Sequence, residues 1–151
     1  MRPFLPVRRV FLIAALAFIL DAVFATALAL QLNLSDPVIG PGTARDTWFL
    51  TGTSISAPGV FMIVYIVFLL LATRRGWVGV VGSVVITLQT LVSGLSLISD
   101  WGAMQRALEQ HLTVLMGLAV GIFFIAMPLI VISGMATLVL QWRGRSRVAT
   151  S

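Results

Sequence analysis

The sequence predicts an all-α membrane protein: a four-helix transmembrane bundle with its N and C termini in the cytoplasm. Three observations support this fold class, namely the composition, the four long apolar stretches and the positions of the arginines. Of the 151 residues, 59% are hydrophobic and only 10% are charged, and the mean hydropathy is +1.06. Ordinary soluble domains carry about 25% charged residues. The length fits one domain, and the composition excludes an ordinary soluble one.

Four apolar stretches are the expected spans, because a helix needs about 20 residues to cross a hydrocarbon core of about 30 Å. They cover residues 10–32, 54–73, 77–98 and 112–141. The second has an uninterrupted apolar run of only Val60 to Ala72, so the polar stretch before it is expected to complete the crossing. The fourth is longer than a crossing requires, which predicts a projection, a tilt or a bend at Pro128.

The connections follow from turn-forming and polar residues. Residues 33–53 contain Asp36-Pro37 and Gly40-Pro41-Gly42, which end helices and favour turns, so this segment is expected as an outer loop. Residues 99–111 form the second outer loop, in which a short helix is expected from Ser99 or Asp100. Residues 74–76 are a tight cytoplasmic turn, and residues 142–151 a cytoplasmic tail.

Arginine placement predicts the orientation, because excess arginine marks the cytoplasmic side of a membrane protein. Eight of the ten arginines lie at three points without an acidic neighbour: Arg2, Arg8, Arg9, Arg74, Arg75, Arg143, Arg145 and Arg147. The other two arginines and four of the five acids lie in the two remaining connections. All of the eight except Arg2 are expected to anchor lipid headgroups. The four tryptophans lie at the predicted interfaces, which agrees with this topology.

A second interpretation of the N-terminus stays open. The basic start, the apolar run and the small residues at 25–29 resemble a cleavable signal peptide, and the arginine pair Arg8-Arg9 resembles a twin-arginine export signal. Asp21 interrupts the apolar run, which is also longer than most signal cores, and this favours an uncleaved span. A mature protein that starts near Leu30 would have only three spans.

Asp21 is the leading candidate for a functional residue. It lies twelve residues beyond Arg9, which places it about 18 Å further along a helix and near the bilayer midplane. A charged aspartate at that depth costs roughly 2.5 to 3.5 kcal/mol, so such residues usually face the protein interior. Tyr65 and Gln89 lie at matching depths in the second and third spans. We therefore predict a buried polar cluster of Asp21, Tyr65 and Gln89.

The predicted cluster supports two hypotheses. The spans contain no arginine or histidine, so Asp21 has no salt-bridge partner within them. In the first hypothesis it is a neutral hydrogen-bonding residue that fixes helix packing or assembly. In the second it is a proton or cation site, with Gln89 and Tyr65 shaping the pocket.

Small residues predict close helix contacts. Gly117 and Gly121 form a GxxxG pattern in the fourth span, and Gly79 and Ser83 have the same spacing in the third. Small side chains at this spacing let two helix backbones approach each other. The contacts are expected within one chain, with oligomerisation as the alternative.

Several classes of function find no support in the sequence. There are no cysteines and a single histidine, His111, so neither a metal site nor a cofactor is expected. There is no nucleophile–base pair and no phosphate-binding glycine loop, so we do not expect an enzyme, although an enzyme acting on lipid-like substrates stays as a third hypothesis. The basic residues flank spans instead of sharing one folded face, which argues against nucleic-acid binding.

The sequence therefore predicts a small non-enzymatic membrane protein that acts as a subunit or accessory of a membrane assembly, or as a homo-oligomer. Its expected partners are the lipid bilayer and other membrane proteins or itself. The alternative is a small proton- or cation-linked transporter or channel centred on Asp21. All ten basic residues are arginine, a bias typical of GC-rich bacterial genomes, so we expect a multi-pass protein of a bacterial cell membrane.

Overall fold

The computed structural model describes residues 4–32, 34, 44–53, 55–74, 76–99, 102, 105, 109 and 114–148. These residues are almost entirely helical. The helices are α1 (Phe4–Leu32), α2 (Ala44–Thr51), α3 (Gly59–Thr73), α4 (Trp77–Ser99) and α6 (Val114–Val148). Gly102, Gln105 and Glu109 are also helical, while Asp100 and the rest of the expected short outer helix lie outside the described residues.

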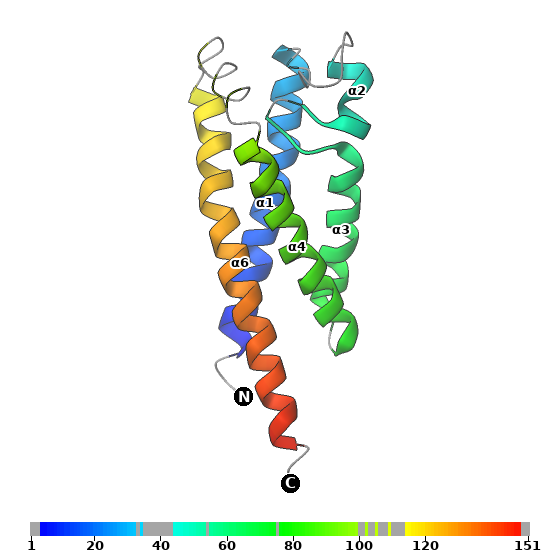
Figure 1. Cartoon of the computed structure of the whole chain (residues 1–151), viewed down its shortest axis with the longest axis vertical. Helices are drawn as coiled ribbons and strands as arrows, with labels where there is room; N and C mark the ends of the chain where they lie inside the picture. The colour runs from blue at the N-terminus through cyan, green and yellow to red at the C-terminus, as the bar shows by residue number, and fades with distance from the viewer. Residues whose placement is uncertain are drawn as a thin grey trace.

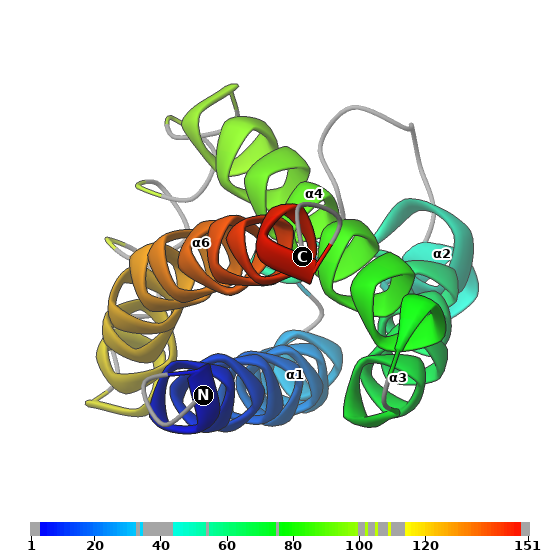
Figure 2. The same cartoon turned by 90° about the horizontal axis from the view of Figure 1, so that it is seen from below.

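The four longer helices run side by side, and α2 lies at one end of them (Figure 1). α1 packs most extensively against α6, α3 packs against α4, and α4 also contacts α6. The view along the bundle shows α4 crossing between α6 and α3 (Figure 2). α1 begins, α6 ends and α3 gives way to α4 at the end opposite α2 (Figure 1).

Three described helices contain segments long and apolar enough to cross a membrane, namely Pro6–Leu32, Trp77–Ser96 and Gly117–Leu140. The prediction of an all-helical protein with long apolar helices is therefore confirmed. α3 is equally apolar in character but has only 15 residues. α6 continues unbroken through Pro128, the residue at which a bend was one of the expected outcomes.

The structure differs from the expected layout around residues 44–58. Part of the expected outer loop forms α2, and the second apolar helix begins only at Gly59. Pro58 takes the position before the helix, with φ −52° and ψ 141°, so the chain is extended there. Before it, the backbones of Thr53 and Ser56 pair in a tight turn, with N–O distances of 3.0 and 3.4 Å. This turn replaces the helical backbone that a complete crossing would otherwise need.

Glycine lets α3 and α4 approach closely. A Cβ atom at Gly82 would collide with the backbone nitrogen of Ala72 and lie 2.7 Å from the carbonyl oxygen of Phe68. A Cβ atom at Gly79 would collide with the carbonyl oxygen of Arg74. Gly76, in the connection between the helices, has a φ of +76°, a conformation that residues with a side chain rarely adopt. The tight α3–α4 hairpin therefore depends on residues without side chains.

Arg8 joins α1 to the end of this hairpin. Its Nη2 atom lies 2.9, 2.8 and 2.7 Å from the carbonyl oxygens of Ala72, Thr73 and Arg74, to which it donates. The last carbonyls of a helix have no partner within the helix, and a positive charge is stabilised there by the helix dipole. Arg8 thus binds the C-terminal end of α3 and fixes α1 against it.

Replacing Gly82 by alanine is expected to destabilise the protein by about 1–3 kcal/mol, because the new methyl group meets backbone atoms that cannot move aside. The matched control is Gly121→Ala in α6, where a Cβ atom would meet nothing within 4 Å. Thermal unfolding followed by circular dichroism in detergent micelles measures both. Equal stability of the two variants would contradict the close approach.

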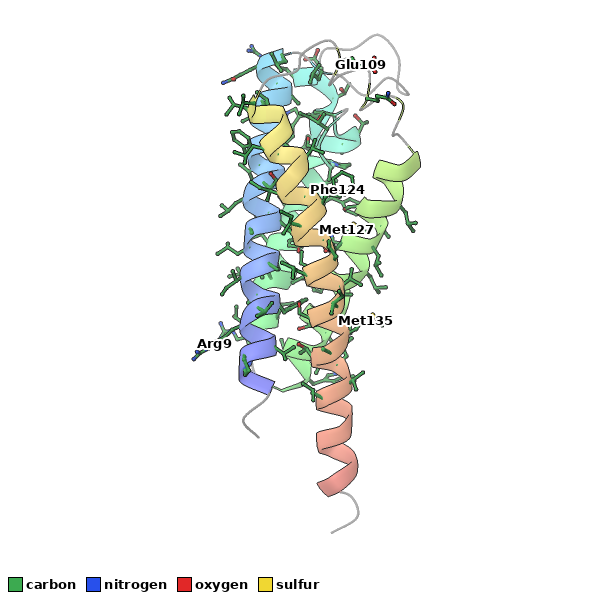
Figure 3. All side chains as sticks on the ribbon, turned by 90° about the vertical axis from the view of Figure 1, so that its left-hand side faces the viewer. Arg9, Glu109, Phe124, Met127 and Met135 are labelled. Atoms are coloured by element: carbon green, nitrogen blue, oxygen red, sulfur yellow. The ribbon has the colours of Figure 1, made fainter. Side chains whose placement is uncertain are left out.

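Replacing Arg8 by alanine is expected to loosen the last turn of α3, with a loss of about 1 kcal/mol in the free energy of unfolding. Arg9→Ala is the control, because Arg9 is exposed and points away from the other helices (Figure 3). Hydrogen exchange of the amides at the end of α3 should accelerate in Arg8→Ala only. The same acceleration in both variants would show that Arg8 does not hold this turn.

Candidate functional site

Asp21 is enclosed within the protein. It is only 6% exposed, and Ala14, Ala25 and Leu28 on the same side of α1 are buried with it. One carboxylate oxygen, Oδ1, is buried and has no hydrogen-bond partner among the described residues. This burial agrees with the general rule that intramembrane carboxylates face the protein interior.

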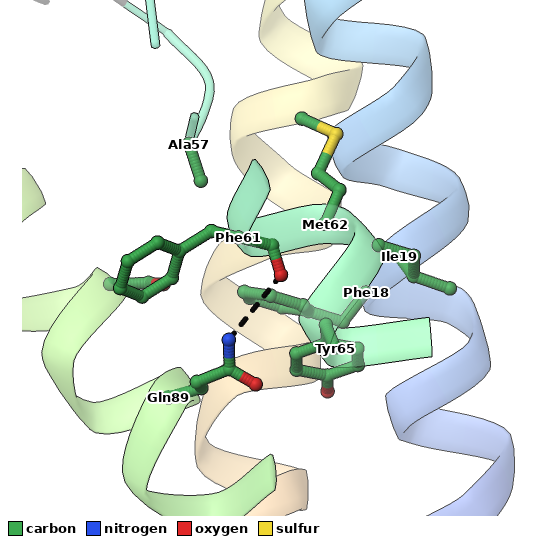
Figure 4. Close-up of a pocket in the computed structure, with 8 residues that line it drawn as sticks. Phe18, Ile19, Ala57, Phe61, Met62, Tyr65 and Gln89 are labelled. Atoms are coloured by element: carbon green, nitrogen blue, oxygen red, sulfur yellow. Dashed lines mark hydrogen bonds between the residues drawn. The ribbon is translucent and has the colours of Figure 1, made fainter. Parts of the chain in front are cut away.

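Tyr65 and Gln89 line one cavity between α1, α3 and α4 (Figure 4). The residues that line it are Phe18, Ile19, Ala57, Phe61, Met62, Tyr65, Gln89 and Ser93. Asp21 is not among them. Of the three residues predicted to cluster, the structure thus brings two together around this cavity and places the third outside its lining.

The Tyr65 side chain is fixed by the packing of its ring. It is 3% exposed and stacks on Phe18 with ring centroids 5.3 Å apart and an interplanar angle of 28°. Phe18 in turn contacts Phe123 of α6, with centroids 5.5 Å apart. The three aromatic rings therefore connect α3, α1 and α6 through one continuous contact. The Tyr65 hydroxyl is buried, lies close to the Thr90 side chain and has no partner in full hydrogen-bond geometry within the described part of the chain.

Only the nitrogen of the Gln89 side-chain amide makes a hydrogen bond to a described residue. Its Nε2 donates to the carbonyl oxygen of Phe61 at 3.3 Å, which links α4 to α3 (Figure 4). Its Oε1 is buried and, among the residues that the structure describes, has no hydrogen-bond partner. A buried acceptor without a partner costs about 1–3 kcal/mol. The cavity is therefore bordered by a polar atom, Gln89 Oε1, that has no partner among the described residues.

Sequence reasoning did not identify a second polar group, formed by Thr26, Ser56 and Thr53. The Thr26 hydroxyl lies 2.9 Å from the Ser56 hydroxyl and donates to the carbonyl oxygen of Ala22 at 2.8 Å. The Ser56 hydroxyl also lies 2.8 Å from that of Thr53. These contacts tie the turn before α3 to α1. A threonine inside the first apolar span was the available signal.

Further buried hydroxyls do not form a site, because each of them binds the backbone of its own helix. The hydroxyls of Ser83, Thr87, Thr90, Ser133 and Thr137 donate to the carbonyl four residues earlier. Such bonds satisfy a polar side chain without a second helix. They let α4 and α6 carry polar residues in an apolar environment at little cost.

The predicted packing residues occupy two different environments. Gly79 and Ser83 are buried, Gly79 against the end of α3. Gly117 is exposed and Gly121 half-buried, and a Cβ atom at either would meet nothing within 4 Å. Besides Gly79, close contacts involve glycines outside the predicted set, namely Gly82 in the α3–α4 hairpin, Gly94 and Gly134. A Cβ atom at Gly94 would collide with Met127, and one at Gly134 with the Thr87 hydroxyl.

The predicted lipid anchors that can be placed lie at one end of the bundle. Arg9 and Arg74 are exposed, whereas Arg8 is bound to the end of α3. Arg75 and the side chains of Arg143, Arg145 and Arg147 lie outside what the structure describes, although α6 extends through these last three residues. His111 is likewise outside it. Within the described residues there is no group of three or more histidine, cysteine, aspartate or glutamate side chains that could hold a metal.

Comparisons of the chain with protein-family models, with curated proteins and with solved structures give no match. The conclusion about the class of protein therefore rests on the helices. Three of them are long and apolar enough to cross a bilayer, and many large apolar side chains on their surfaces are exposed. These features indicate an all-helical membrane protein that crosses the bilayer more than once.

Proposed function

We propose that the chain is a four-span protein of the cell membrane that acts as a non-enzymatic subunit or accessory of a membrane assembly, or as a homo-oligomer. The observation that carries this proposal is the burial of Asp21 outside the cavity that Tyr65 and Gln89 line. Transport of protons or ions uses ionisable groups placed along a pathway. A carboxyl group enclosed against neighbouring helices fits a role in fixing helix packing instead.

A crossing by α3 is part of this proposal. Its 15 residues span about 22 Å, which is less than a hydrocarbon core of about 30 Å. The remaining depth is supplied by the turn before it, in which Gly52 and Thr53 are buried and the Thr53 and Ser56 backbones are paired. Non-helical backbone is tolerated at membrane depth where protein covers it. This arrangement supports four crossings with α1 and α6 entering from the same side.

The arginines support a cytoplasmic location for that side. Arg8, Arg9 and Arg74 lie where α1 begins and α3 ends, and α6 extends through three further arginines at the same end (Figure 1). Arg45 of α2 is accompanied by Asp46 at the other end. An uncompensated excess of arginine favours the cytoplasmic side.

A small proton- or cation-linked transporter is the second candidate. The observation that favours it is the buried Oδ1 atom of Asp21, which has no hydrogen-bond partner within the described residues. A carboxylate in that position gains by binding a proton or a cation.

Labelling of single cysteines tests the four crossings, because the chain has no cysteine of its own. A membrane-impermeant maleimide is expected to label Arg45→Cys in intact cells. It should label Thr73→Cys, at the exposed end of α3, only after permeabilisation. Labelling of both positions from the same side would show that α3 does not cross.

Native mass spectrometry of the untagged protein, extracted gently from its membrane, tests the proposed role. We expect a stoichiometric partner or a homo-oligomer, and the same assembly with Asp21→Asn, which keeps the shape and hydrogen bonding of the side chain but cannot titrate. Asp21→Leu should weaken the assembly or its thermal stability. A monomer whose proton or cation flux disappears in Asp21→Asn would support the transporter instead.

A further inference from the structure

The cavity lined by Tyr65 and Gln89 lies where three helices meet, near the middle of α3. α1 contributes Phe18 and Ile19, and α4 contributes Gln89 and Ser93. Figure 4 shows the Gln89 amide and the Tyr65 ring on the same side of the cavity, with the amide nitrogen directed to Phe61. The polar atoms of two helices thus converge on one small space.

These polar atoms define what the cavity can bind. The Tyr65 hydroxyl can donate one hydrogen bond and accept another, whereas Gln89 Oε1 can only accept. Both atoms are buried, and neither has a partner in full hydrogen-bond geometry among the described residues; the Thr90 side chain is close enough to interact with the Tyr65 hydroxyl. The Nε2 of Gln89 is already engaged by the Phe61 carbonyl, so the orientation of the amide is set. A molecule bound here must donate a hydrogen bond to Gln89 Oε1, and it must either donate a hydrogen bond to the Tyr65 hydroxyl or accept one from it.

The size of the cavity limits which molecules with this hydrogen-bonding chemistry can bind. The volume in which the centre of a water-sized sphere fits inside the cavity is about 10 Å³. One water molecule needs about this much space. Pockets for drug-sized molecules or cofactors have volumes of about 300–1,000 Å³. A hard cation such as Ca²⁺ takes about 6–8 oxygen ligands, more than the polar atoms that converge here. The lining therefore fits a single neutral molecule of the smallest size.

We propose that this cavity binds one ordered water molecule, which donates a hydrogen bond to Gln89 Oε1 and bridges it to the Tyr65 hydroxyl. Buried waters typically make about three hydrogen bonds to polar groups that would otherwise lack partners. Ser93 lines the same cavity and is the third lining residue with a polar side chain. The water connects α3 to α4 at a position further along the helices than the close contacts of Gly79 and Gly82 near the hairpin turn.

Water-to-protein nuclear Overhauser contacts, recorded by NMR on the full chain in detergent micelles, test this site directly. We expect cross-peaks between a long-lived water and the Gln89 side-chain amide and Tyr65 ring protons. They should be lost in Tyr65→Phe, which keeps the ring and its contact with Phe18. They should persist in Thr137→Val, the control, since the Thr137 hydroxyl binds Ser133 of its own helix. Absence of long-lived water in the wild-type protein would overturn the proposal.

A double-mutant cycle gives a second test that does not depend on observing the water. Tyr65→Phe is expected to lower the melting temperature of the wild-type protein. It should have a smaller effect in the Gln89→Met background, because the bridge has already lost its other end. Equal effects in the two backgrounds, or a high-resolution structure with a direct bond between the Tyr65 hydroxyl and Gln89 Oε1, would refute the bridge.

Discussion

A polar group that this chain brings into an apolar environment needs a partner within the protein or on a molecule that the protein holds. The bilayer core offers no water, so backbone groups bond within helices, and polar side chains must bond to helices. This constraint accounts for the paired backbones of Thr53 and Ser56, and for the hydroxyls of α4 and α6 that bind their own carbonyls. The exceptions are therefore informative. Among the described residues they are Asp21, Tyr65 and Gln89.

These three residues with unpartnered buried polar atoms fall into two groups that differ in their surroundings. Tyr65 and Gln89 border a cavity, so a small guest can satisfy them, and the aromatic contact of Tyr65 with Phe18 holds the hydroxyl in place. Asp21 is buried together with other residues on the same face of α1 and lies outside the lining of that cavity. Its partner must be a proton, a cation or a group of a neighbouring helix.

The sequence predicted that Tyr65 and Gln89 lie close together, as they do around one cavity, but it did not predict that Asp21 lies outside the lining of that cavity. Counting residues from the arginine-marked ends assigned Asp21, Tyr65 and Gln89 to one layer, but it did not specify which neighbour each side chain faces. The same difference appears for glycine. The GxxxG spacing selected Gly117 and Gly121, whereas close contacts occur at glycines such as Gly82, where a partner backbone is present. α2 was missed because it has only eight residues and is not apolar overall, and it packs through Trp48 and Phe49 against Gly59.

The short length of α3 has a consequence for the surrounding lipid. Lipids beside α1 meet an apolar segment of 27 residues, whereas those beside α3 meet a helix of 15. Hydrophobic mismatch of this kind is relieved when acyl chains tilt or compress locally, at a cost that rises with each ångström. If α3 crosses the bilayer as proposed, the bilayer is expected to thin beside it wherever the turn before α3 does not make up the missing depth. Thinning on that one side would give the protein a preference for thin membranes and would draw other proteins with short spans to that side.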